Sequence, residues 1–569
     1  MICVLSTNIT SPLGFTTEQN YQAVLSGCSA LKRYEGLWGL PEAFAASLFG
    51  KEQIAALAIE GYTRFESLAI HSIREALSYI SIDIASPRVV FILSTTKGNI
   101  GESPSDAAKK IAKAIGLTTT PIVVCNACVS GLSAQLLANH LLSAGLYDHA
   151  IVTGAEVQSK FIVSGFQSLK AVSEEPCRPF DIERNGLNPG EAAATIIYGS
   201  PSSNLPLQWH LIDGAVRSDA YHNVSPSPQA DGLTAAIKAV MEEQDKSQLA
   251  TVCAHGTATL YNDQMEAVAI HRAGLADVPV SALKGYYGHT MGAAGVLEVV
   301  LTIRATDDGI VLPAKGFKEL GVSKELGISN EPRQTDKTSF LKLMSGFGGC
   351  NVAALYVRCT KDNIRWQAKQ PLTLTKTNTI RITSSDEKSL TDIYKRQIGD
   401  YPKFYKMDIL SRLAFVAAEL LAPLPLHRGG ENSSEVFHRG DLEEAIILFN
   451  HSSSLVTDRQ FLATISDAED FTDALAPWNA DKTRCFPSPS LFVYTLPNIA
   501  ASEIAIRHHI CGETCFYILP SKDEAIMQQI LEATLRGTNG TSVISGWVDA
   551  EDEQTFECEL STYNYIPSN

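Results

Sequence analysis

The chain alternates short runs of consecutive apolar residues with segments in which apolar residues recur every three or four positions. Runs of the first kind are typical of strands buried on both faces, and segments of the second kind predict amphipathic helices. The apolar runs lie at 88–98, 121–128, 149–156, 193–199, 249–257 and 353–359, and the helical segments include 65–80 and 131–145. Strands separated by helices in this way predict a layered α/β fold in which helices cover a sheet.

The pattern divides at a polar segment that ends in a proline, 360–371. We therefore predict one domain over 1–359, a linker at 360–371 and a smaller α/β domain over 372–569. The second domain carries one long helical segment at 407–421 and several strand-like runs. These runs lie at 444–453, 490–495, 514–520 and 541–548.

A weak repeat relates the two domains, because each contains a helix followed by three strand-like runs. The repeat aligns SLFVYTLPNIAASE of the second domain with the segment around Cys128 and places Pro497 opposite Cys128. A proline offers neither a nucleophile nor an N–H group. Duplicated units usually complete each other's core. We therefore expect the second domain to be non-catalytic and to pack against a catalytic domain through SLFVYTLPNIAASE.

Composition narrows the class of protein. The net charge of −16 argues against a nucleic-acid partner, since phosphate binding requires a concentrated basic surface. The sequence shows no N-terminal signal segment and no apolar run near the roughly 20 residues that a membrane helix needs. The 12 cysteines mostly stand singly in apolar segments, which indicates reduced thiols and predicts a cytoplasmic protein.

The segment VVCNACVSG carries two cysteines, Cys125 and Cys128. Cys128 directly precedes the helical segment 131–145, and the N-terminus of a helix favours a thiolate and can hold a developing oxyanion. Cys125 lies within the strand and lacks this help. Two small buried core residues are the alternative reading. A metal pair would need two further ligands at a matching spacing, and none follows, so no metal site is expected.

Three later groups carry possible chemistry. His255 follows a strand in AHGTATLYND, Lys284 and His289 lie among glycines in LKGYYGHTMGAAG, and Phe347 lies between glycines in SGFGGCN. Taken singly, a histidine at a strand end is more often a core residue, and SGFGGCN reads as a plain turn. No phosphate-binding loop or dinucleotide fingerprint follows a strand, so no nucleotide cofactor is expected.

Together and in this order, the groups resemble the β-ketoacyl-acyl-carrier-protein synthases, the decarboxylating condensing enzymes of the thiolase superfamily. The resemblance spans residues 1 to about 359. It is carried by SPLG, NACVSG, CRPFDIERNGLNPGEAAA, HGTATLYNDQMEA, KGYYGHTMGAAGVLE and GFGGCN. It implies a thiolase-like layered αβαβα fold, duplicated over halves of about 1–200 and 201–359, followed by a degenerate half-thiolase-like domain at 372–569. It also implies a reaction that needs no metal or organic cofactor.

The resemblance implies a role for each matching residue. Cys128 would carry the acyl group, with Cys125 in the core. His255 and His289 would stabilise the enolate that forms when a malonyl thioester loses carbon dioxide. Lys284 would tune the histidine pair, and Glu298 would organise its surroundings.

The backbone N–H groups of Cys128 and Phe347 would form the oxyanion hole, with Phe347 also acting as a gate. Thr257, Thr290 and Gly348 would contact substrate. One departure is that Ala258 replaces the second glycine of the HGTGT motif usual in the family. The run LNPGEAAA resembles members that build polyunsaturated or aryl-polyene chains more than it resembles the housekeeping elongation enzymes. The pathway implied is fatty acid, aryl polyene or polyketide-type chain elongation.

The resemblance also implies an acyl carrier protein as partner, and either a homodimer or a pseudo-dimer formed with the C-terminal domain. Carrier proteins are acidic, so docking needs basic residues. Arg64 matches a position that the family uses for this, and Lys51 lies nearby in sequence. An ordinary solvated charge is the alternative for both.

Two other interpretations compete with an active condensing enzyme, and a third competes with the non-catalytic reading of the second domain. A non-catalytic partner subunit, similar to the chain-length factors, would have lost the nucleophile, whereas Cys128 and both histidines are present. A non-decarboxylating thiolase would use a second cysteine, and Cys350 of GFGGCN is the candidate. In the second domain, His508, His509, Cys511 and Cys515 could bind a metal, but adjacent helical histidines point about 100° apart.

Overall fold

Fifteen of the strands in the described residues form three groups of five, and the three groups share the same order of hydrogen-bonded neighbours. In the computed structural model, the described residues are 2–200, 207–360, 372–385, 389–421, 444–465, 487–536, 538 and 542–567. We call residues 2–360 of this set the N-terminal region and residues 372–567 the C-terminal region. Within each group, the strands can be numbered one to five along the chain. Their order across the sheet is then one, five, four, two, three in every group.

The strand bounds are as follows. The first group contains β1 (Cys3–Thr10), β7 (Ala192–Gly199), β6 (His149–Glu156), β4 (Val89–Ser94) and β5 (Ile122–Val124). The second contains β8 (Gln208–Ser218), β15 (Cys350–Cys359), β14 (Ser339–Gly346), β9 (Leu249–Cys253) and β10 (Pro279–Ser281). The third contains β16 (Leu372–Thr383), β20 (Phe556–Pro567), β19 (Ser542–Ala550), β17 (Ala445–Asn450) and β18 (Thr514–Ile518).

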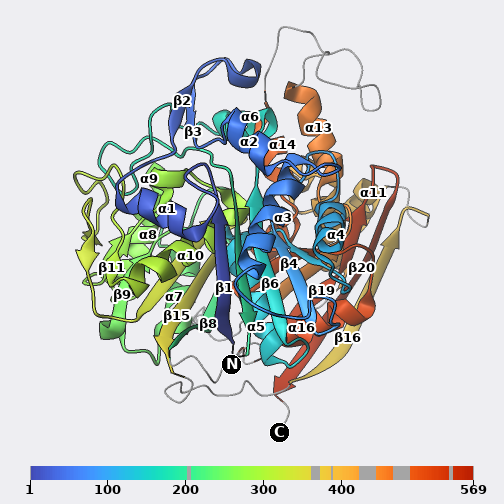
Figure 1. Ribbon diagram of the computed structural model, residues 1–569. Helices are drawn as coiled ribbons and strands as arrows, with labels where there is room; N and C mark the ends of the chain where they lie inside the picture. Colours follow the sequence, from blue (N-terminus) through green and yellow to red (C-terminus); the bar gives the residue numbers. More distant parts are fainter. Residues whose placement is uncertain are drawn as a thin grey trace, which may run out of the picture.

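Strand directions repeat as well as order. In each group the first two pairings are antiparallel and the last two are parallel. The N-terminal region is therefore a duplicated α/β unit, and the C-terminal region repeats one such unit. Figure 1 shows the three units as blue to cyan, green to yellow, and gold to red.

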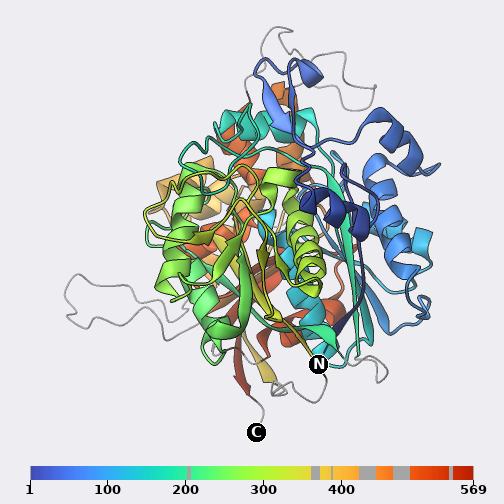
Figure 2. The ribbon, with the colours of Figure 1, turned by 60° about the vertical axis from the view of Figure 1, so that its left-hand side comes forward.

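Helices separate and cover the sheets of the N-terminal region. Helices α5 (Ser130–Ser143) and α10 (Ala294–Asp307) pack against each other and contact strands of both sheets, so they form a middle layer. Nearly every residue of both helices is buried, including polar ones such as Gln135 and Glu298, as expected for helices covered on all sides. Helices α3 (Arg64–Leu77) and α7 (Asp231–Met241) cover the two outer faces. The result is the expected αβαβα layering, and Figure 2 brings the green outer helices forward.

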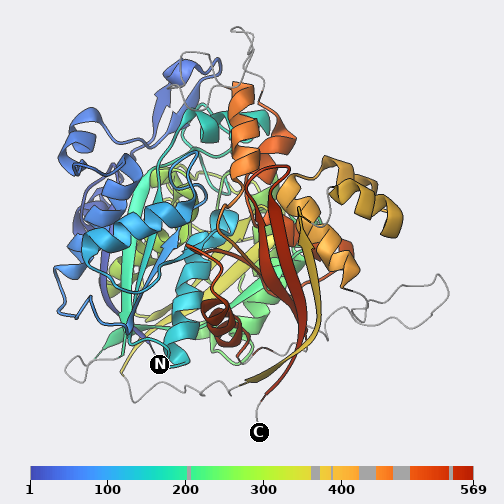
Figure 3. The same ribbon diagram turned by 90° about the vertical axis from the view of Figure 1, so that its right-hand side faces the viewer.

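The C-terminal region joins the N-terminal region edge to edge. Strand β18 pairs antiparallel with β5, with Tyr517 opposite Val124. Beyond the paired residues, Phe516 N–H donates to the side-chain oxygen of Asn126 at 2.7 Å. Helix α16 (Glu524–Leu535) packs against α5. Figure 3 shows the dark red helix and strands of this region beside the blue and cyan elements. The edge strand nearest Cys128 is thus covered by the C-terminal region.

One part of the sequence-based repeat is wrong. The segment 490–495 was expected to be a strand opposite 121–128, but it lies in α14 (Pro489–Tyr494), which is followed by α15 (Ile499–His508). A short apolar run cannot be distinguished from a buried helix by periodicity. Here Ser488 caps the helix and Pro489 occupies its first turn. The structural counterpart of β5 is β18, so Pro497 is not the equivalent of Cys128; that place falls within 519–523, which contains no cysteine.

Two further expectations concern the chain outside this core. None of the helices in the described ranges is long and apolar enough to cross a membrane. The predicted linker, 360–371, lies outside the described residues except for Thr360.

Candidate active site

Cys128, His255, His289 and Phe347 line one cavity of about 310 Å³. Cys128 lies in a single 3-10 turn, Ala127–Val129, between the end of β5 and the start of α5. Ala127 has a φ of 48°, so the chain turns sharply through a left-handed conformation immediately before the cysteine. Cys128 is 8% exposed. The turn therefore presents a nearly buried cysteine to the cavity.

The protonation state of this thiol differs from the expectation based on helix position. Burial raises the pKa of Cys128 to about 12, and the positive charge of Lys284 offsets this only in part. A helix N-terminus contributes partial charge worth about 0.3–1 kcal/mol at most exposed sites, which is too little to outweigh full desolvation. The cavity therefore holds a neutral thiol.

The hydrogen bonds of the two histidines define their tautomers. Lys284 Nζ lies 3.3 Å from Nδ1 of His255, and an ammonium can only donate, so the ring proton resides on Nε2. The backbone N–H of Met291 donates to Nδ1 of His289 at 3.3 Å, which leaves the proton on Nε2 there too. Within the described residues, His289 Nε2 has no hydrogen-bond partner. Each ring therefore carries its N–H donor on Nε2, whereas its Nδ1 accepts a hydrogen bond from the protein.

Both imidazoles are neutral near pH 7. Burial, followed by the charge of Lys284, lowers the pKa of His255 and of His289 well below the usual range. The ring centroids are 5.1 Å apart, with the planes nearly perpendicular at 82°. Two neutral N–H donors at this separation can both serve one oxygen atom bound between them.

A buried carboxylate between two ammonium groups supports the pair. Lys284 Nζ lies 2.8 Å from one oxygen of Glu298, and Lys342 Nζ contacts the other. Lys284 also donates to the backbone oxygen of His255. Despite burial, the two lysines hold the pKa of Glu298 below its usual range. Lys284 and Glu298 thus lie where the sequence placed them, and Lys342 is a third member that the sequence analysis missed.

Two other missed residues fix the loop that carries His255. Glu266 accepts hydrogen bonds from the N–H groups of His255 and Gly256, and Asp263 accepts from Ala258 and Phe180. Both carboxylates are buried, on the first two turns of α8 (Leu260–Arg272). The signal was available in HGTATLYNDQMEA, where the two acidic residues stand three apart. Lys342 was visible as a lone charge in an apolar strand.

Phe347, the residue predicted to act as a gate, occupies a three-residue loop between β14 and β15. Phe347 packs against Phe166 with ring centroids 6.0 Å apart. A Cβ atom at Gly346 would lie 3.3 Å from the backbone nitrogen of Cys128, so this glycine leaves that N–H uncovered. The cavity lining includes Thr257, but it includes neither Thr290 nor Gly348. The two sites predicted for substrate contact at Thr290 and Gly348 are therefore not on the cavity wall.

Comparison with known protein families agrees with the motifs. The model of the beta-ketoacyl synthase N-terminal domain matches residues 86–199, and that of the C-terminal domain matches residues 210–318. Residues 86–199 and 210–318 belong to the β-ketoacyl synthase family. The first match covers β4 to β7 of the first strand group, and the second covers most of β8 together with β9 and β10 of the second group. Both confirm the family resemblance inferred from the motifs.

Curated relatives include carrier-protein synthases and polyketide synthases. The chain is 29% identical over 272 residues to the tetracenomycin polyketide synthase ketoacyl synthase alpha subunit of Streptomyces glaucescens, covering 45% of this chain and 64% of that protein. It is 27% identical over 413 residues to 3-oxoacyl-[acyl-carrier-protein] synthase 2 of Vibrio cholerae, covering 63% and 99%. The chain spans slightly less than two thirds of the first curated relatives that it matches.

One solved structure matches the fold of almost the whole chain. The structure entitled "PfaC Keto synthase-Chain length factor" superposes with a TM-score of 0.73 at 14% identity, covering 99% of this chain and 78% of that one. A β-ketoacyl synthase from Burkholderia phymatum superposes with a TM-score of 0.57 at 22% identity, covering 63% and 99%. At these identities the likeness concerns the fold.

The other candidate thiols of this family member lie outside the cavity. Cys125 is fully buried, and its Sγ lies 3.5 Å from the backbone oxygen of Thr96. Cys350, the candidate second cysteine of a thiolase, faces the C-terminal region, with Sγ 3.6 Å from the oxygen of Thr514. Neither residue lines the wall around Cys128. The cavity therefore contains one thiol and two imidazoles.

The two candidate docking residues differ in their surroundings. Arg64, the first residue of α3, forms an ion pair with the fully buried Glu191. Glu191 also accepts hydrogen bonds from the N–H groups of Phe49 and Gln158. Lys51, at the start of α2 (Lys51–Leu57), is exposed. Arg64 therefore has a structural partner, whereas the charge of Lys51 faces solvent.

No group of three or more potential ligands in the described ranges could hold a metal ion. Among the four residues considered as a metal site in the C-terminal region, His508 lies 2.9 Å from a carboxylate oxygen of Glu419, Cys515 is buried in β18 and Cys511 is exposed. These three side chains lie in different environments and do not form a shared ligand set.

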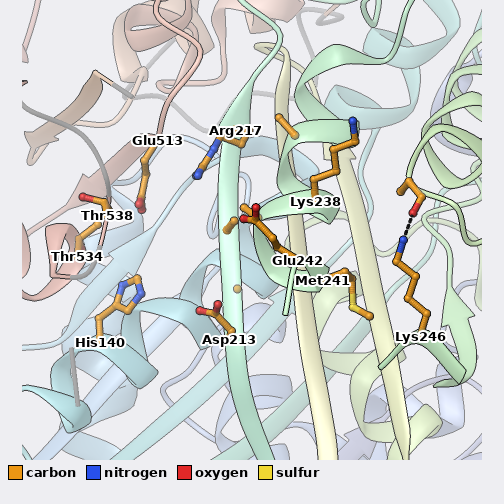
Figure 4. A pocket seen from close by; sticks show the side chains of 15 residues that line it. His140, Asp213, Arg217, Lys238, Met241, Glu242, Lys246, Glu513, Thr534 and Thr538 are labelled. Atoms are coloured by element: carbon orange, nitrogen blue, oxygen red, sulfur yellow. Dashed lines mark hydrogen bonds between the residues drawn. The ribbon is translucent and has the colours of Figure 1, made fainter. Parts of the chain in front are cut away.

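A second cavity, of about 440 Å³, lies where α5, β8, α7 and the C-terminal region meet. Figure 4 shows charged side chains of both signs around it, among them Arg217, Glu242 and Glu513. It contains neither Cys128 nor the two histidines. Despite its larger volume, it lacks the groups that condensation chemistry needs.

Proposed function

We propose that this chain is a 3-oxoacyl-carrier-protein synthase, which condenses an acyl group on Cys128 with a malonyl group carried by an acyl carrier protein. The observation that carries the proposal is the convergence of one thiol and two neutral imidazoles, both protonated on Nε2, on a single cavity. This arrangement matches the needs of a decarboxylating condensation.

In the first half of the reaction, the Cys128 sulfur attacks the acyl thioester carbonyl. The new carbon–sulfur bond replaces the bond to the carrier, and the carrier thiol leaves with the proton of Cys128. The oxyanion formed on the way is stabilised by the N–H groups of Cys128 and Phe347. Because the pKa of the thiol is raised, proton loss accompanies the attack.

In the second half, the malonyl group loses carbon dioxide and leaves its bonding electron pair as an enolate. The Nε2–H groups of His255 and His289 donate to the enolate oxygen. The enolate carbon then attacks the acyl carbonyl on Cys128, and the carbon–sulfur bond breaks. The product is a 3-oxoacyl thioester on the carrier, and the departing Cys128 thiolate is reprotonated.

The same geometry bears on the two rival readings. A non-decarboxylating thiolase needs a second thiol as acid and base, but Cys350 faces Thr514 and not the cavity. A non-catalytic subunit similar to a chain-length factor would not retain the nucleophile, both histidines and the buried lysine–glutamate support. Both considerations favour the decarboxylating enzyme.

We further propose that the C-terminal region is a non-catalytic pseudo-subunit, so that the chain contains its own pseudo-dimer. Strand β18 completes the sheet at β5, and the place equivalent to Cys128 has no cysteine. Solved structures of similar fold are entitled ketosynthase–chain length factor. The proposed setting is the cytoplasm, in fatty acid, aryl polyene or polyketide chain elongation.

Cys128→Ala tests the proposal. The variant should lose acyl transfer from acyl-carrier protein, measured by mass spectrometry of the intact protein, while decarboxylation of malonyl-carrier protein persists. Wild-type protein supplied with both substrates should release carbon dioxide and form a 3-oxoacyl-carrier product. Full condensation by Cys128→Ala, or acylation at another residue in the wild type, would remove Cys128 as the nucleophile.

A further inference from the structure

The loop that carries Phe347 is held by the C-terminal region. Asn498, the residue that precedes α15, donates from its side-chain amide to the backbone oxygen of Phe347 at 2.9 Å. Asn498 is 6% exposed, so this hydrogen bond is shielded from solvent. The contact joins residues 151 positions apart in the chain.

Gly348 makes this approach possible. Its φ is +91°, and a Cβ atom there would lie 2.6 Å from the amide nitrogen of Asn498. Any side chain at this position would both strain the backbone and displace the amide. Gly348, absent from the cavity wall, therefore serves the contact between the loop and the C-terminal region.

A second set of contacts reaches the same loop through Asn223. The N–H of Gly348 donates to the backbone oxygen of Asn223 at 2.7 Å. The Asn223 side chain donates to Glu503 at 2.6 Å and accepts from the hydroxyl of Ser502 at 2.9 Å. The nitrogen and the oxygen of the Asn223 side-chain amide are thus both paired with side chains of α15.

Glu503 is the buried carboxylate that anchors the hydrogen bonds of Asn223. Its side chain is completely buried, and it also accepts a hydrogen bond from the hydroxyl of Tyr494 at 2.7 Å. Lys403 Nζ lies 2.9 Å from its other oxygen. Both carboxylate oxygens are therefore engaged, and a buried charge held in this way resists displacement.

The two anchored segments form part of the cavity wall. Phe347 and Gly349 line it from one segment, and Val224 and Ser225 line it from the other. The N–H of Asp219 joins the two segments by donating to the oxygen of Gly349 at 2.7 Å. Movement of Phe347 away from Cys128 would therefore require the contacts with α15 to loosen.

We propose that Asn498, Ser502 and Glu503 are positioning residues through which the C-terminal region holds the Phe347 gate closed and limits access to Cys128. This role deepens, and rests on, the proposed function of the same site. The C-terminal region would then control when the nucleophile is reachable, in addition to covering the β5 edge.

The rate at which iodoacetamide alkylates Cys128 in the full-length protein tests this proposal, with the modified peptide quantified by mass spectrometry. Asn498→Ala and Glu503→Ala should each raise the rate about 5- to 10-fold, since each removes hydrogen bonds that hold the closed gate. Glu503→Gln should stay within about twofold of the wild type, because its side-chain oxygen still accepts from Asn223.

Asn378→Ala is the matched control, because the Asn378 side-chain amide donates to a backbone oxygen within the C-terminal region, that of Leu421, at 3.2 Å. Its alkylation rate should equal that of the wild type. Ser502→Ala removes one hydroxyl only and provides a milder variant if either larger change prevents folding. Wild-type rates in both alanine variants would overturn the proposal, as would an equal increase in Asn378→Ala.

The readout does not depend on condensation. A protein that shows the expected alkylation pattern but condenses nothing would overturn the proposed function alone. A protein that condenses normally, with alkylation unaffected by Asn498→Ala and Glu503→Ala, would overturn the positioning role alone.

Discussion

Lys97 Nζ lies 2.6 Å from Asp458 Oδ1, and the two side chains are only 3% and 5% exposed. Lys97 belongs to the N-terminal region, and Asp458 lies on α13 (Leu455–Ile465) of the C-terminal region. Removal of one partner from a buried ion pair leaves an uncompensated charge, which typically costs about 3–5 kcal/mol. The two regions are thus joined by a buried ion pair as well as by the β5–β18 pairing.

A chain truncated after residue 360 should therefore be poorly soluble or inactive. It would expose the β5 edge and leave Lys97 without its carboxylate partner. Coexpression of residues 371–569 as a separate polypeptide should restore soluble protein and activity, measured by gel filtration and carbon dioxide release. A stable and fully active truncated protein would contradict the pseudo-subunit role.

His289→Ala should lower malonyl decarboxylation about 100-fold and affect self-acylation much less. The Nε2–H of His289 is one of two donors available to the enolate, and loss of one oxyanion donor commonly costs about 10²–10³ in rate. Carbon dioxide release and acyl-enzyme formation would be measured separately. His71→Ala, at a histidine outside the cavity, serves as the control. Equal loss of both activities would contradict the division of roles.

The extent to which sequence predicted structure depended on how local the signal was. Runs such as 88–98 and 249–257 became the buried strands β4 and β9 because an uninterrupted apolar run needs shielding on both faces. The motifs grouped Cys128, His255 and His289, and in the structure these three residues line one cavity. The run at 490–495 failed because four apolar residues fit a strand or a buried helix equally well.

The pattern of hydrophobic and polar residues could not predict contacts between distant segments of the chain. The hydrogen bond between Asn498 and the Phe347 oxygen depends on how the start of α15 packs against the loop between β14 and β15, which no periodicity encodes. Burial is likewise a tertiary property, so the helix position of Cys128 suggested a stabilised thiolate, whereas desolvation raises the pKa of the thiol. Lys342 and Glu266 were readable as charges in apolar surroundings, but their partners were not.

The reactivity of Cys128 should rise steeply with pH. A raised pKa means that the neutral form dominates at pH 7, and the thiolate fraction grows about tenfold for each pH unit below the pKa. The alkylation rate of Cys128 should therefore climb from pH 7 to pH 9 without a plateau. The exposed Cys28 in the same sample provides an internal comparison. A plateau for Cys128 below pH 8 would show that the thiol is activated in the resting enzyme.

Glu298→Gln should destabilise the protein by about 3–5 kcal/mol, because Lys284 and Lys342 would remain buried without a counter-charge. Urea denaturation would measure the loss in free energy of unfolding. Glu532→Gln, a partly buried carboxylate whose hydrogen bond is to Gln528, is the control and should change stability by less than about 1 kcal/mol. Equal stability of Glu298→Gln and the wild type would contradict a charged network.

Carrier docking should depend on Lys51 more cleanly than on Arg64. Arg64→Glu would place a second carboxylate beside the buried Glu191, so any loss of binding would be mixed with a loss of stability. Lys51 is exposed, so Lys51→Glu changes surface charge with little structural cost. We expect Lys51→Glu to weaken binding of an acidic carrier protein about 3- to 10-fold at low salt. The difference should shrink at 0.5 M salt because screening weakens charge attraction.

The control for net charge is Lys395→Glu, at an exposed lysine on α11 (Leu390–Gln397), which should bind the carrier like the wild type. Carrier binding would be measured by surface plasmon resonance. Equal affinities of Lys51→Glu and Lys395→Glu would remove Lys51 from the docking surface.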